Sequence, residues 1–157
     1  MVKVFVGYDS SYGNTKLAAE AIAEGMQGVE GVEASVASVK EVDMNKVAQY
    51  DVLVLGAPNH MARPSRTMMH FVDKLVGLDL KAHKVAVFGT YSGKLRDPDR
   101  AVNKMEKTLG EKFPNMGLVS PSLSVRVHWV TGPIFDGELD RCREFGKRIA
   151  KQVKQGI

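Results

Sequence analysis

Side chains that donate hydrogen bonds are concentrated in one short segment near the start of the chain, Asp9-Ser10-Ser11-Tyr12-Gly13-Asn14-Thr15. The segment offers hydroxyl groups and an amide, but it contains neither Lys nor Arg. An anion bound here would be held by hydroxyls and backbone N–H groups rather than by a cationic side chain. Gly13 permits a tight turn because it has no Cβ. The alternative interpretation is a helix-capping loop that binds no ligand.

The elements on either side of this segment place it where α/β proteins bind anions. An apolar run, Val2–Tyr8, precedes it and is typical of a buried strand. After it, apolar and small residues recur on one face of a helix: Leu17, Ala18, Ala21, Ile22, Gly25 and Met26. The first turn of a helix has free N–H groups and carries the positive end of the macrodipole. Two other phosphate loops are excluded, because the chain contains neither a G-x-x-x-x-G-K-S/T nor a G-x-G-x-x-G sequence.

Apolar stretches alternate with helical periodicity along the rest of the chain. Further strands are predicted at residues 32–36, at 52–57 ending at Pro58, at 85–88 ending at Gly89-Thr90, and at 117–119 with 123–127, which together form one edge strand interrupted by Pro121. Further helices are predicted after Asp43, over 68–76, from an Asp97-Pro98 start, and over 139–153. Five strands alternating with five helices predict a single α/β domain, residues 1–157, with a doubly wound parallel sheet and helices on both faces.

The carboxyl ends of the strands are where such a sheet binds its ligand. Three loops are expected there, residues 9–15, 58–64 and 91–97. Trp129 is expected to pack against the last helix, with a place at the ligand site as the alternative. Cys142 lies on the apolar stripe of that helix, and we expect it to be inert.

Composition narrows the functional classes. The net charge is +4, but basic and acidic residues are interleaved, so nucleic-acid binding is not indicated. No apolar run approaches the roughly 20 residues of a membrane span, and no signal peptide is recognisable, so we expect a cytoplasmic protein. A single Cys and scattered His residues give no disulfide and no metal site.

On these residues the chain resembles the flavodoxins over its whole length. The motif is Ser10-Ser11-Tyr12-Gly13-Asn14-Thr15 directly after the first strand, and in that family this loop holds the phosphate of flavin mononucleotide (FMN) without a cationic side chain. Residues 121–133 and 140–146 look most like the flavodoxin half of the A-type flavoproteins. We expect no di-iron domain of the kind found in those proteins, because the four His residues occur singly, without H-x-[HED]-x-D-H spacing. His128-Trp129-Val130-Thr131 looks like a small insertion. The resemblance implies a five-stranded short-chain fold with strand order 2-1-3-4-5.

The resemblance also implies a set of cofactor-binding residues in the three loops, with no catalytic residue and no metal ligand. They are Ser10, Ser11, Tyr12, Gly13, Asn14, Thr15, Pro58, Asn59, His60, Met61, Ala62, Thr90, Tyr91, Ser92 and Gly93.

The function implied by the resemblance is that of an electron carrier rather than an enzyme, shuttling electrons through the semiquinone and hydroquinone states of FMN. A flavin-dependent NAD(P)H:quinone or related reductase is one alternative, and a flavin-free binding module of the same fold is another. The expected partners are redox proteins, such as acidic iron–sulfur proteins or flavoenzymes, because the loops carry Arg63, Arg66, Lys94, Arg96 and Arg100. We expect a monomer or a weak homo-oligomer.

Overall fold

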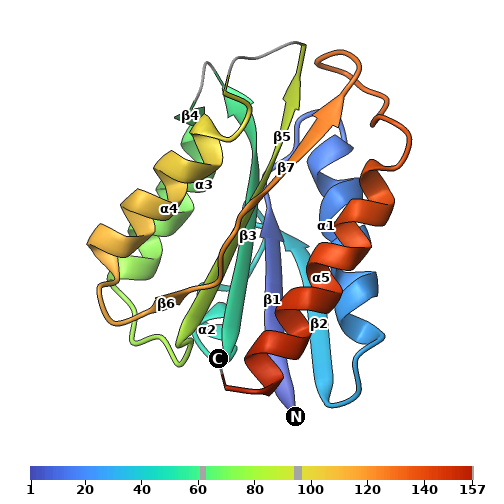
Figure 1. The fold of residues 1–157 in the computed structure, drawn as a ribbon. Helices are drawn as coiled ribbons and strands as arrows, with labels where there is room; N and C mark the ends of the chain where they lie inside the picture. The colour runs from blue at the N-terminus through green and yellow to red at the C-terminus, as the bar shows by residue number, and fades with distance from the viewer. Residues whose placement is uncertain (61–62, 94–96, 157) are drawn as a thin grey trace.

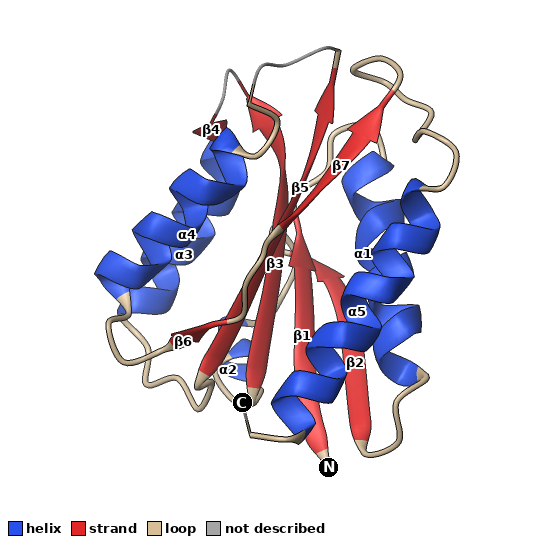
Figure 2. Ribbon diagram, in the orientation of Figure 1, coloured by secondary structure: helices blue, strands red, loops and turns tan. Residues whose placement is uncertain are grey.

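The computed structural model describes residues 1–60, 63–93 and 97–156. A central sheet lies between two layers of helices, with α1 and α5 on one face and α3 and α4 on the other (Figures 1 and 2). The strands are β1 (Val2–Tyr8), β2 (Val32–Ser38), β3 (Val52–His60), β4 (Arg63–Pro64), β5 (Lys84–Ser92), β6 (Gly117–Leu118) and β7 (Leu123–Val127). The helices are α1 (Asn14–Gln27), α2 (Met44–Val47), α3 (Arg66–Val76), α4 (Arg100–Lys112) and α5 (Glu138–Lys154).

The main sheet is parallel and has the order β2-β1-β3-β5-β6, with β7 also paired to β5. β6 and β7 together are the interrupted fifth strand, so the predicted topology and the interruption at Pro121 are confirmed. The register changes between the pairs Val85–Leu118 and Phe88–Leu123, so the chain leaves the sheet between β6 and β7. β4 was not predicted; it is a two-residue strand that pairs antiparallel with the end of β3.

Some element boundaries differ from the prediction. β3 continues past Pro58 to His60, and β5 continues past Thr90 to Ser92. Both extensions find partners, β3 in β4 and β5 in β7, and a local sequence pattern does not reveal such pairing. Helix α4 begins at Arg100 rather than at Asp97-Pro98, because the Asp97 carboxylate accepts a bond from the backbone N–H of Asp99 and closes a turn before the helix.

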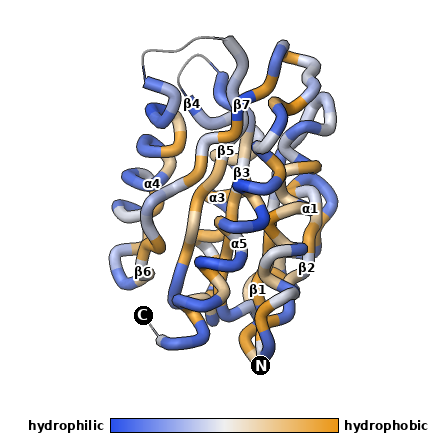
Figure 3. The backbone as a smooth tube through the Cα atoms, turned by 45° about the vertical axis from the view of Figure 1, so that its right-hand side comes forward, coloured by the Kyte–Doolittle hydropathy of each residue, from blue (hydrophilic) through white to orange (hydrophobic). Residues whose placement is uncertain are grey.

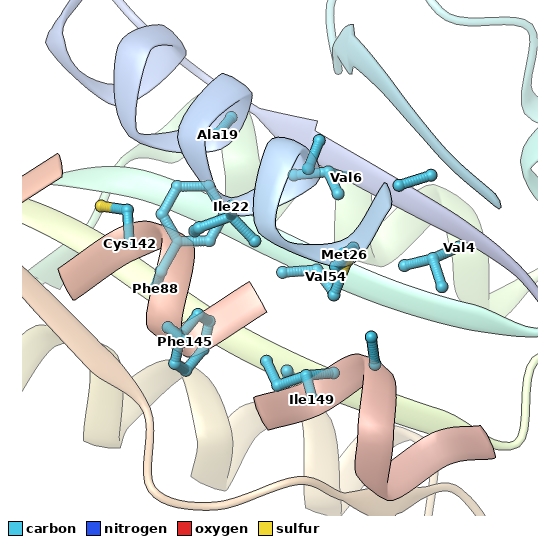
Figure 4. Close-up of a cluster of buried hydrophobic side chains, with 14 of the residues drawn as sticks. Val4, Val6, Ala19, Ile22, Met26, Val54, Phe88, Cys142, Phe145 and Ile149 are labelled. Atoms are coloured by element: carbon cyan, nitrogen blue, oxygen red, sulfur yellow. The ribbon is translucent and has the colours of Figure 1, made fainter. Parts of the chain in front are cut away.

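The core consists of two apolar clusters, one on each face of the sheet. The hydropathy of the chain follows this arrangement, with apolar strands in the middle and polar outer faces on the helices (Figure 3). Between α1, α5 and the sheet, the side chains of Ile22, Phe88, Phe145 and Ile149 are buried (Figure 4). Burial of each such side chain stabilises the fold by roughly 1.5–3 kcal/mol.

Helices α1 and α5 approach each other closely through two glycines. A Cβ on Gly25 would overlap the backbone carbonyl of Arg143, and a Cβ on Gly146 would overlap that of Ile22. Each glycine therefore lets the backbone of one helix lie against the backbone of the other. The contact fixes the position of α1, whose N-terminal end reaches the loops described next.

Candidate functional site

The loops at the carboxyl ends of the parallel strands surround a pocket of about 350 Å³. These loops lie together at the upper end of the sheet in Figure 1. The lining residues come from four parts of the chain: Ser10, Ser11, Tyr12, Asn14 and Thr15; Pro58, Asn59 and His60; Thr90, Tyr91 and Ser92; and Val127 and Val130. The volume lies within the range usual for small-molecule sites.

The N-terminus of α1 forms one wall of this pocket. Gly13, with φ of 88°, turns the chain into the helix, and its N–H donates to the Ser10 hydroxyl at 2.9 Å. The first intrahelical bond is donated by Leu17 to the Gly13 carbonyl at 3.0 Å, so the N–H groups of the first turn have no acceptor within the helix. That turn has no acidic side chain, and this end of the helix attracts anions.

Thr15 and Thr90 connect the first loop to the third. Their hydroxyl oxygens lie 2.9 Å apart, and both residues are buried at the base of the pocket. One hydroxyl donates its proton to the other, which keeps its own proton for a further acceptor. The pair therefore offers one hydroxyl donor to a ligand while it joins α1 to β5.

The described residues of the second loop belong to a hairpin of β3 and β4 rather than to an irregular loop. Asn59 pairs with Pro64, and His60 pairs with Arg63, across the antiparallel strands β3 and β4. Pro58, Asn59 and His60 line the pocket from this hairpin. The strand pairing holds the backbone of this wall in place, since both of its sides are part of the sheet.

A fourth wall is the β7 hairpin, residues 127–134. Sequence reasoning considered only Trp129 of this hairpin for the ligand site, as an alternative, and missed the lining residues Val127 and Val130. Val127 and Ile134 pair antiparallel, the His128 N–H donates to the Pro133 carbonyl at 2.8 Å, and the Gly132 N–H donates to the Trp129 carbonyl at 2.9 Å. Phe135 packs against the base of this hairpin. Its ring is stacked on the His128 ring with the two centroids 3.8 Å apart, and the Arg126 guanidinium carbon lies 4.4 Å from the Phe135 centroid. The hairpin is therefore held by backbone bonds and ring stacking.

The tip of the β7 hairpin presents apolar side chains to solvent. Trp129 is 74% exposed and Val130 66% exposed, and Val130 lines the pocket. The expectation that Trp129 packs against the last helix was wrong, because Trp129 lies in the turn of the hairpin, closed by the Gly132–Trp129 bond, with most of its side chain exposed. The sequence did contain a signal for this wall. The insertion His128–Thr131 directly follows the fifth predicted strand, and therefore lies at the same edge of the sheet as the three predicted loops.

The structure brings together most of the residues that the sequence singled out. Gly13 and Gly93 do not line the pocket; each has a positive φ, 88° and 80°, and shapes a turn beside it. Met61 and Ala62 lie outside the described residues. Cys142 is buried on α5, and burial raises the pKa of its thiol to about 12, which agrees with an inert side chain.

Comparison with known proteins agrees with the fold. The family model described as flavodoxin matches residues 6–133, and this chain belongs to the flavodoxin family. Over 77 residues the chain is 40% identical to a flavodoxin of Aquifex aeolicus (strain VF5), a match that covers 49% of this chain and 42% of that protein. The chain therefore spans less than half the length of that relative in the match.

Solved structures match over nearly the whole chain. A flavodoxin from the domain Archaea has a TM-score of 0.79 and 25% identity, and the match covers 98% of this chain and 99% of that one. The metal-soaked Flv1 flavodiiron core from Synechocystis sp. PCC6803 has a TM-score of 0.78 and 19% identity, and the match covers 99% of this chain but 37% of that one. The second likeness is one of fold alone. Family membership therefore rests on the family model and on the likeness in fold and sequence to the archaeal flavodoxin.

Proposed function

We propose that this protein binds FMN in the pocket at the carboxyl ends of the strands and carries electrons between redox proteins. The observation that supports this most is the donor set at the N-terminus of α1. It combines the free N–H groups of a first helical turn with the hydroxyls of Ser10, Ser11 and Thr15. This donor set opens into a pocket large enough for a small molecule.

The donor set suits a phosphate group. None of the described lining residues is acidic, so nothing there repels a dianion. The neighbouring carboxylate, Asp9, is buried and lies 3.7 Å from the ammonium of Lys40. Each hydrogen bond to a charged phosphate contributes roughly 1.5–3 kcal/mol to affinity. The N–H groups and hydroxyls would hold the phosphate without a cationic side chain.

The remaining walls suit a flat, mostly apolar ring. Pro58 on one side and Val127 and Val130 on another offer apolar surface, and Tyr12 and Tyr91 offer aromatic rings. FMN, when bound, supplies the electron-transfer chemistry, and the protein orients it and limits its contact with water. These side chains serve binding and positioning, and the proposal requires no nucleophile or general acid from the protein.

The proposal extends to partners and location. The partners are redox proteins, among them acidic iron–sulfur proteins, and the protein acts in the cytoplasm as a monomer or weak homo-oligomer. Among the described residues, the structure has no helix of the length and apolar character required to cross a membrane.

The test is a titration of the purified, flavin-depleted protein with FMN, followed by the visible spectrum and flavin fluorescence. We expect one FMN to bind per chain, with riboflavin binding more weakly because it lacks the phosphate. A protein that binds neither flavin would contradict the proposal and favour the flavin-free module. Steady-state turnover of NAD(P)H with a quinone by the FMN-loaded protein would instead favour the reductase.

A further inference from the structure

A second concave surface lies between α3 and the loop that follows β2. It is a groove of about 500 Å³, and buried Val39 and Phe71 contribute its apolar surface. Its polar lining is strongly basic, with Lys40 from the loop and Arg66, His70 and Lys74 from α3. None of the described residues that line the groove is acidic.

The spacing on α3 explains this concentration of charge. Arg66, His70 and Lys74 recur every four residues, so they form one row along the helix and all three are exposed. The apolar residues of α3, among them Met68 and Leu75, are buried on another side of the helix. The fold therefore does not use the basic row to pack α3 against the sheet.

The cations of the basic row are not neutralised by ion pairs among the described residues: Arg66, His70 and Lys74 form none there. Asp73, the carboxylate on the same helix, is bound to Lys112 of α4 at 2.6 Å. That bond lowers the pKa of the Asp73 carboxyl, and His70 has a smaller effect in the same direction. By contrast, the groove at the opposite end of the sheet is lined by both signs of charge, with Glu33 and Asp51 beside Lys3, Lys46 and Lys81.

The groove adjoins the proposed cofactor site through two short connections. Lys40 pairs with Asp9, which directly precedes Ser10 of the phosphate loop. Arg66 follows Ser65, the N-cap of α3, which in turn follows β4 of the hairpin that forms another pocket wall. A molecule seated in the groove would therefore lie beside the pocket.

We propose that this groove is the docking surface for an acidic segment of the redox partner. The inference rests on the proposed function, and it names the chemistry of the partner. The basic row extends over about two turns of α3, roughly 12 Å at 1.5 Å per residue, which suits a row of carboxylates better than a single compact anion. Complementary charge at such a surface raises the association rate and sets the orientation of docking.

The test uses the FMN-loaded protein and a reduced, acidic plant-type [2Fe–2S] ferredoxin, with electron transfer followed by stopped flow. The variant Arg66→Gln/Lys74→Gln removes two charges from the groove. The matched control Lys147→Gln/Lys151→Gln removes two charges from exposed positions on α5, on the other face of the sheet. We expect the groove variant to lower the second-order rate constant about tenfold at low ionic strength, and the control to leave it within twofold. The difference should largely vanish at about 0.5 M salt, where charges are screened.

Equal rate constants for the two variants would overturn the docking surface while leaving FMN binding, measured by titration, unaffected. A second measurement does not depend on the flavin: amide NMR shifts of the purified protein on addition of a hexaglutamate peptide. Shifts at the groove residues of α3, lost in the groove variant, support the proposal. Shifts elsewhere overturn it, and so does tight binding of inorganic pyrophosphate at the groove without binding of the peptide, which would indicate a small-anion site.

Discussion

Replacement of Gly132 by Ala should weaken FMN binding, although Gly132 itself does not line the pocket. Gly132 has a φ of 96°, and a Cβ built on it would lie 2.6 Å from Oδ1 and 3.0 Å from Nδ2 of Asn14. Asn14 is buried, begins α1 and lines the pocket. The added methyl group therefore displaces the Asn14 amide, and through it the pocket wall that we propose to face the phosphate.

The magnitude follows from the interaction that is lost. A hydrogen bond to a charged group contributes roughly 1.5–3 kcal/mol, or about 10- to 150-fold in affinity. The positive φ adds a strain of about 1–2 kcal/mol for a residue with a Cβ, which lowers the free energy of unfolding. We expect FMN affinity to fall about 10- to 150-fold and riboflavin affinity less than about threefold, because riboflavin has no phosphate.

The assay is fluorescence titration with FMN and riboflavin in parallel. The matched control is Gly137→Ala: Gly137 also has a positive φ, 85°, but no atom lies within 4 Å of the point that its methyl group would occupy. A second comparison adds Gly132→Ala to an Asn14→Ala variant. There the ratio of FMN affinity to riboflavin affinity should not fall further, because the amide that Gly132→Ala displaces is already gone. The reasoning is refuted if Gly137→Ala weakens FMN binding as much, or if the loss persists without the Asn14 amide.

Three further predictions concern the pocket, the core and the helix contact. Thr15→Ala should lower FMN affinity about 10- to 150-fold and riboflavin affinity much less, whereas Thr108→Ala on α4 should change neither; equal losses for the two flavins would remove the phosphate assignment. Burial raises the pKa of Cys142 from 9.0 to about 12. Between these values the folded protein keeps a thiol proton that the unfolded chain releases, so the free energy of unfolding is unaffected by Cys142 below about pH 9 and falls as the pH rises towards 12. Iodoacetamide at about pH 9 should label Cys142 only after unfolding, and rapid labelling of the native protein would contradict its burial. Gly146→Ala should lower the free energy of unfolding, measured in urea, by about 1–3 kcal/mol, because the methyl group overlaps the α1 backbone. The control Gly110→Ala places its methyl group in open space on α4 and should raise this free energy by about 0.5–1 kcal/mol. The same change in stability for both variants would exclude a steric cause.

The arrangement of the fold could be predicted from the sequence because each element carries its own pattern. Central strands such as β3 are continuously apolar, and α3 has an apolar stripe of helical period, so their alternation determines the sheet. The interruption of the fifth strand at Pro121 could also be predicted, since proline has no backbone N–H to donate to a neighbouring strand.

The pocket could be predicted only in part, because its remaining features depend on tertiary pairing. The three loops with polar side chains were recognisable, and the structure brings them together. Val130 gave no chemical signal, since an apolar residue in a loop is ordinary. Its place in the pocket depends on the pairing of β7 with β5 and on the turn at Gly132. The end of β3 was misjudged for the same reason, because β4 supplies its partner.

The close contact between α1 and α5 has a consequence for the order of events during synthesis. Helix α1, whose first turn forms a wall of the pocket, leaves the ribosome long before α5, the helix that packs against it through Gly25 and Gly146. Until α5 has emerged, Ile22 and the rest of that face of α1 lack the apolar cover that α5 supplies. The pocket wall at the N-terminus of α1 is therefore supported only after α5 has been made and has packed against α1.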